Sequence, residues 1–185
     1  MNLENALKIE GWMELHDLEW LAAHARGASR IVEVGSWHGR STTVLADNTD
    51  GIVFAVDTWG GSEEHRGSMP DLPDKSVYRD FCERTYQSFL RNMQPYIDRG
   101  KVIPVHLPSV EAASIFRACN QMFDFVFIDA AHDYENIKAD IAAWTPLVKG
   151  LLCGHDAGHA PVMQATQEAF PNRPPNECSM WLVNL

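Results

Sequence analysis

Short apolar segments alternate with helix-like segments along the whole chain, and this alternation constrains the fold more than any other feature. The predicted strands are residues 30–35, 51–57, 101–106, 123–130, 150–156 and 180–185. The predicted helices are residues 12–27, 40–48, 76–96, 109–120, 134–148 and 161–170. Strands that are apolar throughout are covered on both faces, so we expect a doubly wound α/β fold around a mostly parallel, open sheet.

Several single residues refine this expectation. Pro104 lies inside the third strand and predicts an edge position or a bulge, because proline cannot donate to a neighbouring strand. Ser109 opens the next helix as a candidate N-cap. Trp12, Trp20 and Trp144 have helical spacing and apolar neighbours, so we expect their rings in the core.

Polar residues end the predicted strands, and in open α/β sheets the ligand lies at this end, near the point where the strand order reverses. These residues are Glu33, Gly35, Asp57, His106, Asp129, His155 and Asp156. Gly35 permits a tight turn, and Asp57, which follows it by 22 positions, ends the next strand. At this spacing a carboxylate can accept hydrogen bonds from a ribose, which favours a nucleoside ligand.

The turn after the first strand does not favour a dinucleotide. It reads Gly35-Ser36-Trp37-His38-Gly39, so bulky residues replace the middle glycine that lets the backbone approach a pyrophosphate. Glu33 adds a carboxylate that would repel a pyrophosphate and attract an ammonium group. A nucleoside with an amino-acid tail satisfies both conditions, and S-adenosylmethionine is such a molecule.

Four ordered segments then carry a family resemblance: "EVGSWHGRST", "VDTWGG", "FIDAAHDYENIKADIAAW" and "LLCGHD". They resemble the class I S-adenosylmethionine-dependent methyltransferases, within the small-molecule branch of macrocin-type and cephalosporin-hydroxylase-like O-methyltransferases. The resemblance runs from about Gly11 to Asp156 and on towards Trp181. The short remainder after Phe170 predicts a shortened C-terminal hairpin.

The resemblance implies roles for individual residues. It implies that Glu33 and Gly35 lie near the methionine end of the cofactor, that Asp57 holds the ribose hydroxyls, and that His106 to Ser109 flank the adenine. It implies that Asp129 lies beside the reacting methyl group. The full implied cofactor set is Glu33, Gly35, Ser36, Gly39, Ser41, Asp57, Thr58, Trp59, His106, Ser109 and Asp129. Trp59 is expected to stack on adenine or to act in a lid.

The reaction centre is predicted at Asp129, His132, His155 and Asp156. A hydroxyl acceptor must lose its proton, with the help of a base or of a metal ion that lowers the pKa of the hydroxyl. In one hypothesis Asp129, His155 and Asp156 bind a divalent cation, and the imidazole favours Mn²⁺, Fe²⁺ or Zn²⁺ over Mg²⁺. In a second, His132 or His155 is a metal-free base that Asp129 or Asp156 orients. In a third, the four groups only cap helices and satisfy one another.

The charge balance limits the partners. The 15 basic and 25 acidic residues give a net charge of −10, which argues against bulk nucleic-acid binding. No signal peptide, membrane-length apolar run or paired-cysteine motif is evident, so we expect a cytoplasmic protein with reduced thiols. The expected partner is a small-molecule acceptor, and homo-oligomerisation is left open.

We expect one methyltransferase domain over residues 1–185, with an N-terminal helical segment at residues 1–28 and a lid loop at residues 58–76. Two other functions compete with methyl transfer. A catalytically silent nucleoside-binding or assembly module would keep Glu33, Gly35 and Asp57. It would not need the cluster of Asp129, His155 and Asp156. An NAD-dependent oxidoreductase would need the missing middle glycine.

Overall fold

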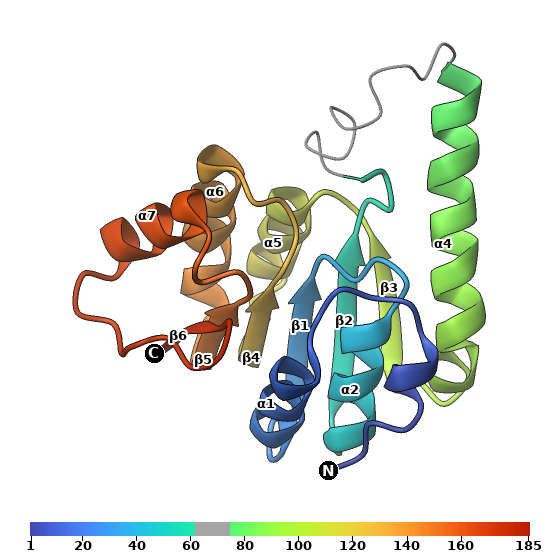
Figure 1. Cartoon of the computed structure of the whole chain (residues 1–185), viewed down its shortest axis with the longest axis horizontal. Helices are drawn as coiled ribbons and strands as arrows, with labels where there is room; N and C mark the ends of the chain where they lie inside the picture. The colour runs from blue at the N-terminus through green and yellow to red at the C-terminus, as the bar shows by residue number, and fades with distance from the viewer. Residues whose placement is uncertain (62–74) are drawn as a thin grey trace.

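The computed structural model describes residues 1–61 and 75–185 (Figure 1). Residues 62–74, which make up most of the predicted lid, lie outside the described residues. The strands are β1 (Arg30–Val34), β2 (Ile52–Asp57), β3 (Val102–His106), β4 (Phe123–Ile128), β5 (Val148–Gly154) and β6 (Trp181–Asn184). The helices are α1 (Leu15–Ala25), α2 (Arg40–Asn48), α4 (Lys75–Ile97), α5 (Ser109–Ala118), α6 (Tyr134–Trp144) and α7 (Ala160–Ala169). Short 3-10 helices cover Ala6–Lys8 and Thr145–Leu147.

The six strands form one sheet in the order β3-β2-β1-β4-β5-β6. The first five are mutually parallel, and β6 runs antiparallel to β5. The chain moves outward from β1 through β2 to β3 and then crosses back to β4, so the strand order reverses between β1 and β4. The predicted doubly wound, mostly parallel sheet is therefore confirmed, and its switch point lies between β1 and β4.

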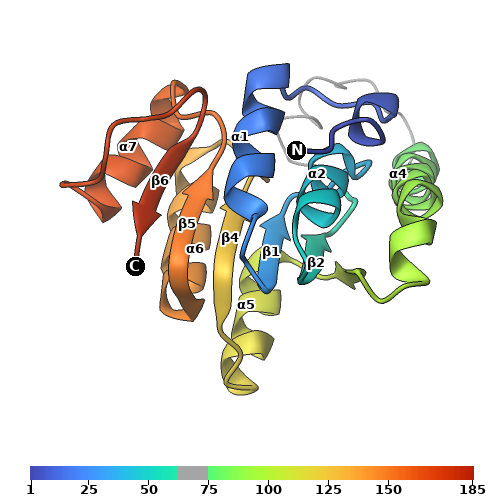
Figure 2. The ribbon, with the colours of Figure 1, turned by 90° about the horizontal axis from the view of Figure 1, so that it is seen from below.

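Two layers of helices bury the two faces of the sheet (Figure 2). Helices α1, α2 and α4 pack with Ile31, Val53 and Phe125 on one face. Helices α5, α6 and α7 pack on the other face, against a set that includes Val32 and Val126. Successive strand residues point to opposite faces, so both faces of β1 need apolar residues. Glu33 is the exception, because it shares the first face with Ile31.

The edge strand β3 contains Pro104, as the sequence predicted. The Val53 N–H donates to the carbonyl of Lys101, the residue directly before β3. Main-chain groups alternate in direction along a strand, so those of Lys101 face β2 and those of Pro104 face the open edge. The missing N–H therefore costs the sheet no hydrogen bond.

Two expectations about single residues were wrong. Trp12 precedes α1 and is 68% exposed rather than buried, because α1 begins only at Leu15. Its ring stacks on Trp37 at 4.0 Å between centroids. Ser109 does not cap α5: Pro108 holds the N-cap position, and the Ser109 hydroxyl accepts a hydrogen bond from Trp144 Nε1 at 2.9 Å. Ser109 therefore ties α5 to α6.

The C-terminal part of the sheet is short. β6 pairs antiparallel with β5, and within the described residues no further strand follows it.

Among residues 1–61 and 75–185, no helix is both long and apolar enough to cross a membrane.

Candidate functional site

The turn of residues 35–39, here called the β1 turn, is shaped by two glycines. Gly35 has φ +93°, and a Cβ added to it would lie 2.1 Å from the carbonyl oxygen of Asp129. Gly39 has φ +90°, and an added Cβ would lie 2.9 Å from Met93 Cε on α4. Both conformations favour glycine. At Gly35 the close approach also brings the β1 turn directly against the end of β4.

Glu33 lies in the protein interior beside this turn and is fully buried. Burial raises its pKa to about 7, and nearby hydroxyls, led by Ser41 and Thr42, offset part of that shift. Thr42 Oγ1 donates to Oε2 of Glu33. Among the described residues neither Glu33 Oε1 nor the buried hydroxyl of Ser36 has a hydrogen-bond partner. Unmatched buried polar atoms are uncommon, and two of them here indicate a place for a ligand or for water.

Asp57 joins the ends of β1 and β2. Its Oδ2 accepts the N–H of Trp37 at 2.8 Å, and its Oδ1 accepts the N–H of Trp59 at 2.7 Å. Burial raises the pKa of this carboxyl, and hydrogen bonds from the main chain oppose the shift. Trp37 and Trp59 both have positive φ values, of 42° and 48°. The carboxylate therefore holds two strained turns together at the switch point.

The side chain of Trp59 is not available to stack on adenine, and that prediction is corrected. The residue is 2% exposed, and its Nε1 donates to the Trp37 carbonyl at 2.8 Å. Its ring packs on Tyr86 and Phe89 of α4, with centroids 4.6 and 4.7 Å away. Trp59 thus has the core position that we expected of Trp12.

The residues expected near the adenine diverge. His106 is exposed at the end of β3, and its Nε2 lies 2.9 Å from the carbonyl oxygen of Thr58. The Thr58 hydroxyl accepts the N–H of Gly60 at 3.1 Å. Ser109 instead contacts Trp144, as described above. His106 and Thr58 therefore lie together beyond β2 and β3, and Ser109 lies towards α6.

Four charged residues gather where β4 and β5 end, and we call Asp129, His132, His155 and Asp156 the charged cluster. His132 Nε2 lies 2.9 Å from Asp156 Oδ2, and His155 Nδ1 lies 3.1 Å from the same oxygen. Asp129 Oδ1 is 3.9 Å from His132 Nε2 and 3.8 Å from His155 Nδ1. The sequence predicted this convergence from strand ends, and Asp129 is anchored by its N–H, which donates to the Val34 carbonyl at 2.7 Å.

The charges of the cluster shift one another. Asp129 and Asp156 raise the pKa of His132 to about 10. Burial lowers the pKa of His155, but Asp156, Asp129 and Asp17 together outweigh it and raise the value to about 9. The two imidazoles hold the pKa of Asp156 far below its usual range. Both histidines are therefore protonated at neutral pH in the free protein.

Asp17 is a further member of this network that the sequence reasoning missed. It lies on α1, is 1% exposed, and its Oδ2 is 3.3 Å from His155 Nε2. Its other oxygen accepts the N–H of Ser179 at 3.1 Å. One signal was present in the sequence: Asp17 shares a helix face with the buried Leu21, where an unpaired carboxylate would be costly.

One group of atoms that could hold a metal ion overlaps the predicted set. Donor atoms of Asp129, His132 and Asp156 all lie within 4.8 Å of one another. His155, which we predicted as a ligand, has Asp17 at one ring nitrogen and Asp156 at the other. Two carboxylates and one imidazole fit Mn²⁺, Fe²⁺ or Zn²⁺ by ligand type.

A family model described as a methyltransferase domain matches residues 32–157, which include most of β1, all of β2 to β5 and most of the residues discussed above. The chain belongs to this methyltransferase family. The match confirms the resemblance that the four sequence segments suggested.

Solved structures show the same fold. A putative caffeoyl-CoA O-methyltransferase from Staphylococcus aureus is 16% identical with a TM-score of 0.65, covering 96% of this chain and 86% of that one. An O-methyltransferase from Bacillus cereus, solved in complex with SAH, is 19% identical with a TM-score of 0.61, covering 91% and 76%. The O-methyltransferase TomG from Streptomyces achromogenes, in complex with SAM, is 16% identical with a TM-score of 0.57, covering 89% and 63%.

A curated relative, the uncharacterised protein y4gI of Sinorhizobium fredii, is 29% identical over 148 residues. The alignment covers 74% of this methyltransferase chain but only 14% of the relative. The aligned part of this chain therefore spans only a small part of the length of that relative.

Proposed function

We propose that this chain is an S-adenosylmethionine-dependent methyltransferase that moves a methyl group to a hydroxyl oxygen of a small molecule. One observation carries the proposal: Gly35 brings the β1 turn into contact with the main chain of Asp129. A cofactor bound at the β1 turn and an acceptor bound at the charged cluster would then lie next to each other, at the neighbouring ends of β1 and β4. Methyl transfer needs this proximity, because the acceptor must be held close to the sulfonium methyl and in line with it.

The polar groups of the β1 turn suit a cofactor with an ammonium group. The unmatched Glu33 Oε1 and Ser36 hydroxyl are acceptors, directly or through one water, for the methionine amino group. The carboxylate of Asp57 retains lone pairs that can accept ribose hydroxyls beside the main-chain N–H groups it already binds. Structures of fold relatives in complex with SAH or SAM support this cofactor.

The charged cluster suits the deprotonation of an acceptor hydroxyl. The converging donor atoms of Asp129, His132 and Asp156 favour a divalent cation there over a metal-free base. Such an ion would lower the pKa of an acceptor hydroxyl bound to it. Asp17 would orient His155, and His155 in turn would hold Asp156 in place.

Ligand binding tests the cofactor. S-adenosylhomocysteine at about 100 times its Kd stabilises a single-site protein by about 2.7 kcal/mol, which is a clear shift of the melting temperature. We expect this shift with S-adenosylhomocysteine and none with NADH, and a smaller shift for Asp57→Asn. Stabilisation by NADH alone would replace the proposal with the oxidoreductase.

Turnover tests the reaction. Production of S-adenosylhomocysteine is measured with panels of phenols, catechols and sugars, with Asp129→Asn as the comparison. We expect the variant to lose turnover at least 100-fold while it keeps most of its affinity for S-adenosylhomocysteine. Cofactor binding without turnover of any acceptor would favour the silent binding module.

Several sequence expectations stay predictions. They are the single methyltransferase domain over residues 1–185 with the N-terminal helical segment of residues 1–28 packed on it, the lid loop at residues 58–76, the absence of bulk nucleic-acid binding, and the cytoplasmic location. The small-molecule acceptor belongs to the proposal itself.

A further inference from the structure

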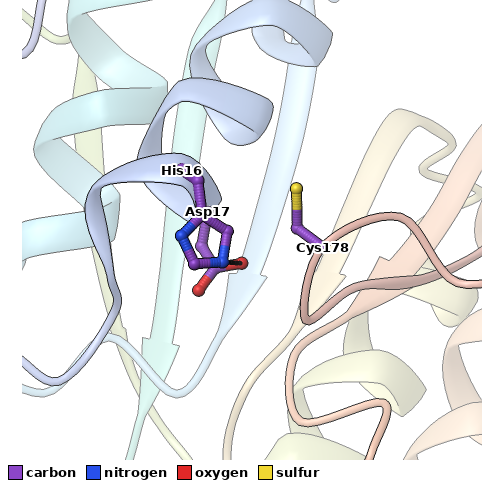
Figure 3. A group of neighbouring side chains, drawn as sticks. All are labelled: His16, Asp17 and Cys178. Carbon is purple, nitrogen blue, oxygen red and sulfur yellow. Dashed lines mark ion pairs between the residues drawn. The ribbon is translucent and has the colours of Figure 1, made fainter.

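A second group of metal-binding side chains lies outside the charged cluster. His16 and Asp17 come from the first turn of α1, and Cys178 comes from the turn before β6 (Figure 3). An imidazole nitrogen, a carboxylate oxygen and the thiol sulfur all lie within 4.8 Å of one another. We call these three residues the α1–turn cluster. They are brought together only by the fold, from opposite ends of the chain.

The cluster is built on a pinned turn. Glu177 and Met180 exchange main-chain hydrogen bonds of 3.0 and 2.9 Å, which places Cys178 at the tip of a tight hairpin. Trp20 Nε1 donates to Glu177 Oε2 at 2.7 Å, and the N–H of Ser179 donates to Asp17 Oδ1 at 3.1 Å. The hairpin is thereby attached to α1 on both sides of Cys178, so the thiol is held near α1 in the absence of an ion.

The spacing of the donor atoms fits a tetrahedral ion. Ligand atoms that lie ~2.1 Å from a tetrahedral zinc ion are about 3.4 Å apart. His16 Nε2 and Asp17 Oδ1 are 3.4 Å apart. The Cys178 sulfur lies within 4.8 Å of a ring nitrogen of His16 and of a carboxylate oxygen of Asp17, and a bound zinc ion would draw it to a Zn–S distance of about 2.3 Å.

We propose that His16, Asp17 and Cys178 bind one zinc ion. A thiolate and an imidazole favour zinc, and a thiolate is a poor ligand for Mg²⁺ or Ca²⁺. The thiol loses its proton to solvent when the Zn–S bond forms, and the carboxylate and the neutral imidazole each donate a lone pair. Three protein ligands leave a fourth position for water. The buried position of Asp17 favours this use, because the ion adds positive charge beside a carboxylate that has little access to solvent.

The ion would also act at a distance. Asp17 uses one oxygen in the α1–turn cluster and the other at His155 Nε2, which lies 3.3 Å away. Zinc would therefore fix the side chain that orients His155, and it would join the C-terminal strand β6 to α1. This inference does not depend on which cofactor or acceptor the charged cluster serves.

Protection of thiols from alkylation tests the site within one molecule. The intact, reduced protein is treated with a maleimide with and without Zn²⁺, and each cysteine is quantified by mass spectrometry. Cys178 and Cys119 are both exposed, so Cys119 is a matched internal control. We expect Zn²⁺ to slow the modification of Cys178 at least tenfold and to leave Cys119 unchanged. Equal rates at Cys178 with and without zinc, or equal protection of both thiols, would overturn the site.

Two substitutions separate a built site from a single reactive thiol. His16→Ala should reduce the protection of Cys178 at least fivefold, because one ligand of three is lost. His132→Ala should leave the protection intact, because it removes a donor only from the charged cluster. Full protection in His16→Ala would contradict the proposal.

Cobalt gives a second readout, because a thiolate bound to cobalt produces a charge-transfer band. Cys119→Ser should keep this band and Cys178→Ser should lose it. A band that persists in Cys178→Ser would exclude the site.

Discussion

The β1 turn and the charged cluster lie side by side, but the chain stabilises their carboxylates in different ways. Beside the β1 turn, Glu33 and Asp57 receive hydrogen bonds from a hydroxyl and from main-chain N–H groups. In the charged cluster, the Asp156 carboxylate is balanced by two imidazoles, one from the preceding residue His155 and one from His132 after β4. The first arrangement depends on backbone geometry, and the second depends on opposite charge.

This difference predicts how the two regions respond to substitution. A hydrogen bond from the main chain persists when a neighbouring side chain changes, but it is lost when the turn itself is distorted. An ion pair between half-exposed groups is weaker and depends on pH and salt. The β1 turn should therefore be sensitive to changes of shape, and the charged cluster to changes of charge.

The largest effect is expected at Gly35. In Gly35→Ala the Cβ would lie 2.1 Å from the Asp129 carbonyl oxygen, and φ is +93°, so we expect a loss of more than ~3 kcal/mol of unfolding free energy. Gly100→Ala is the matched control, because its φ is +65° and no atom lies within 4 Å of the added Cβ. It should lose only about 1 kcal/mol in urea denaturation. Similar losses in both variants would show that the contact with β4 is unimportant.

A smaller effect, dependent on pH, is expected at Glu33. Its pKa is about 7 in the folded protein against 4.5 ordinarily, so the folded state binds an extra proton between these values. Stability should therefore fall as the pH rises from about 4.5 past 7, by about 3 kcal/mol in total. Glu33→Gln cannot lose a proton, so its unfolding free energy should fall less over the same range in urea titrations. Parallel pH profiles for the two proteins would contradict the shift.

The smallest effect on stability is expected at Asp156. Asp156→Asn should cost about 1 kcal/mol, because the ion pairs are partly screened by solvent and asparagine tolerates the φ of +56°. The pKa of His132 should nevertheless fall towards its ordinary value, which NMR titration of the ring would detect. Asp133→Asn is the control: Asp133 caps α6 at the N–H of Asn136, and asparagine caps equally well. An unchanged His132 titration in Asp156→Asn would refute the role of this carboxylate.

The sequence predicted what depends on local pattern. Alternating apolar segments gave the order of strands and helices, and Pro104 correctly indicated an edge strand. The cluster at Asp129, His155 and Asp156 followed from the rule that parallel strands end at one edge of the sheet. These features need only the neighbours of each residue along the chain, together with one general rule of topology.

The sequence did not predict contacts made across the fold. Asp17 reaches His155 from α1, and this contact depends on how α1 packs beside β5 and the hairpin before β6. Trp12 was predicted to be buried because the helical spacing was extended one turn too far, to a residue before α1. Trp59 was predicted to be available to a ligand because the end of a strand was assumed to be exposed. The donor atoms that lie within 4.8 Å of one another belong to Asp129, His132 and Asp156, so they include a histidine that the predicted metal set did not contain.

One feature of the sheet, Pro104 on the outer side of β3, also bears on self-association. The two borders of a β-sheet are where identical molecules most readily add to one another and polymerise. Pro104 removes one donor from the row on one border, which disfavours strand-by-strand growth there. We therefore expect any ordered pairing between copies through the sheet to use the opposite border, at β6.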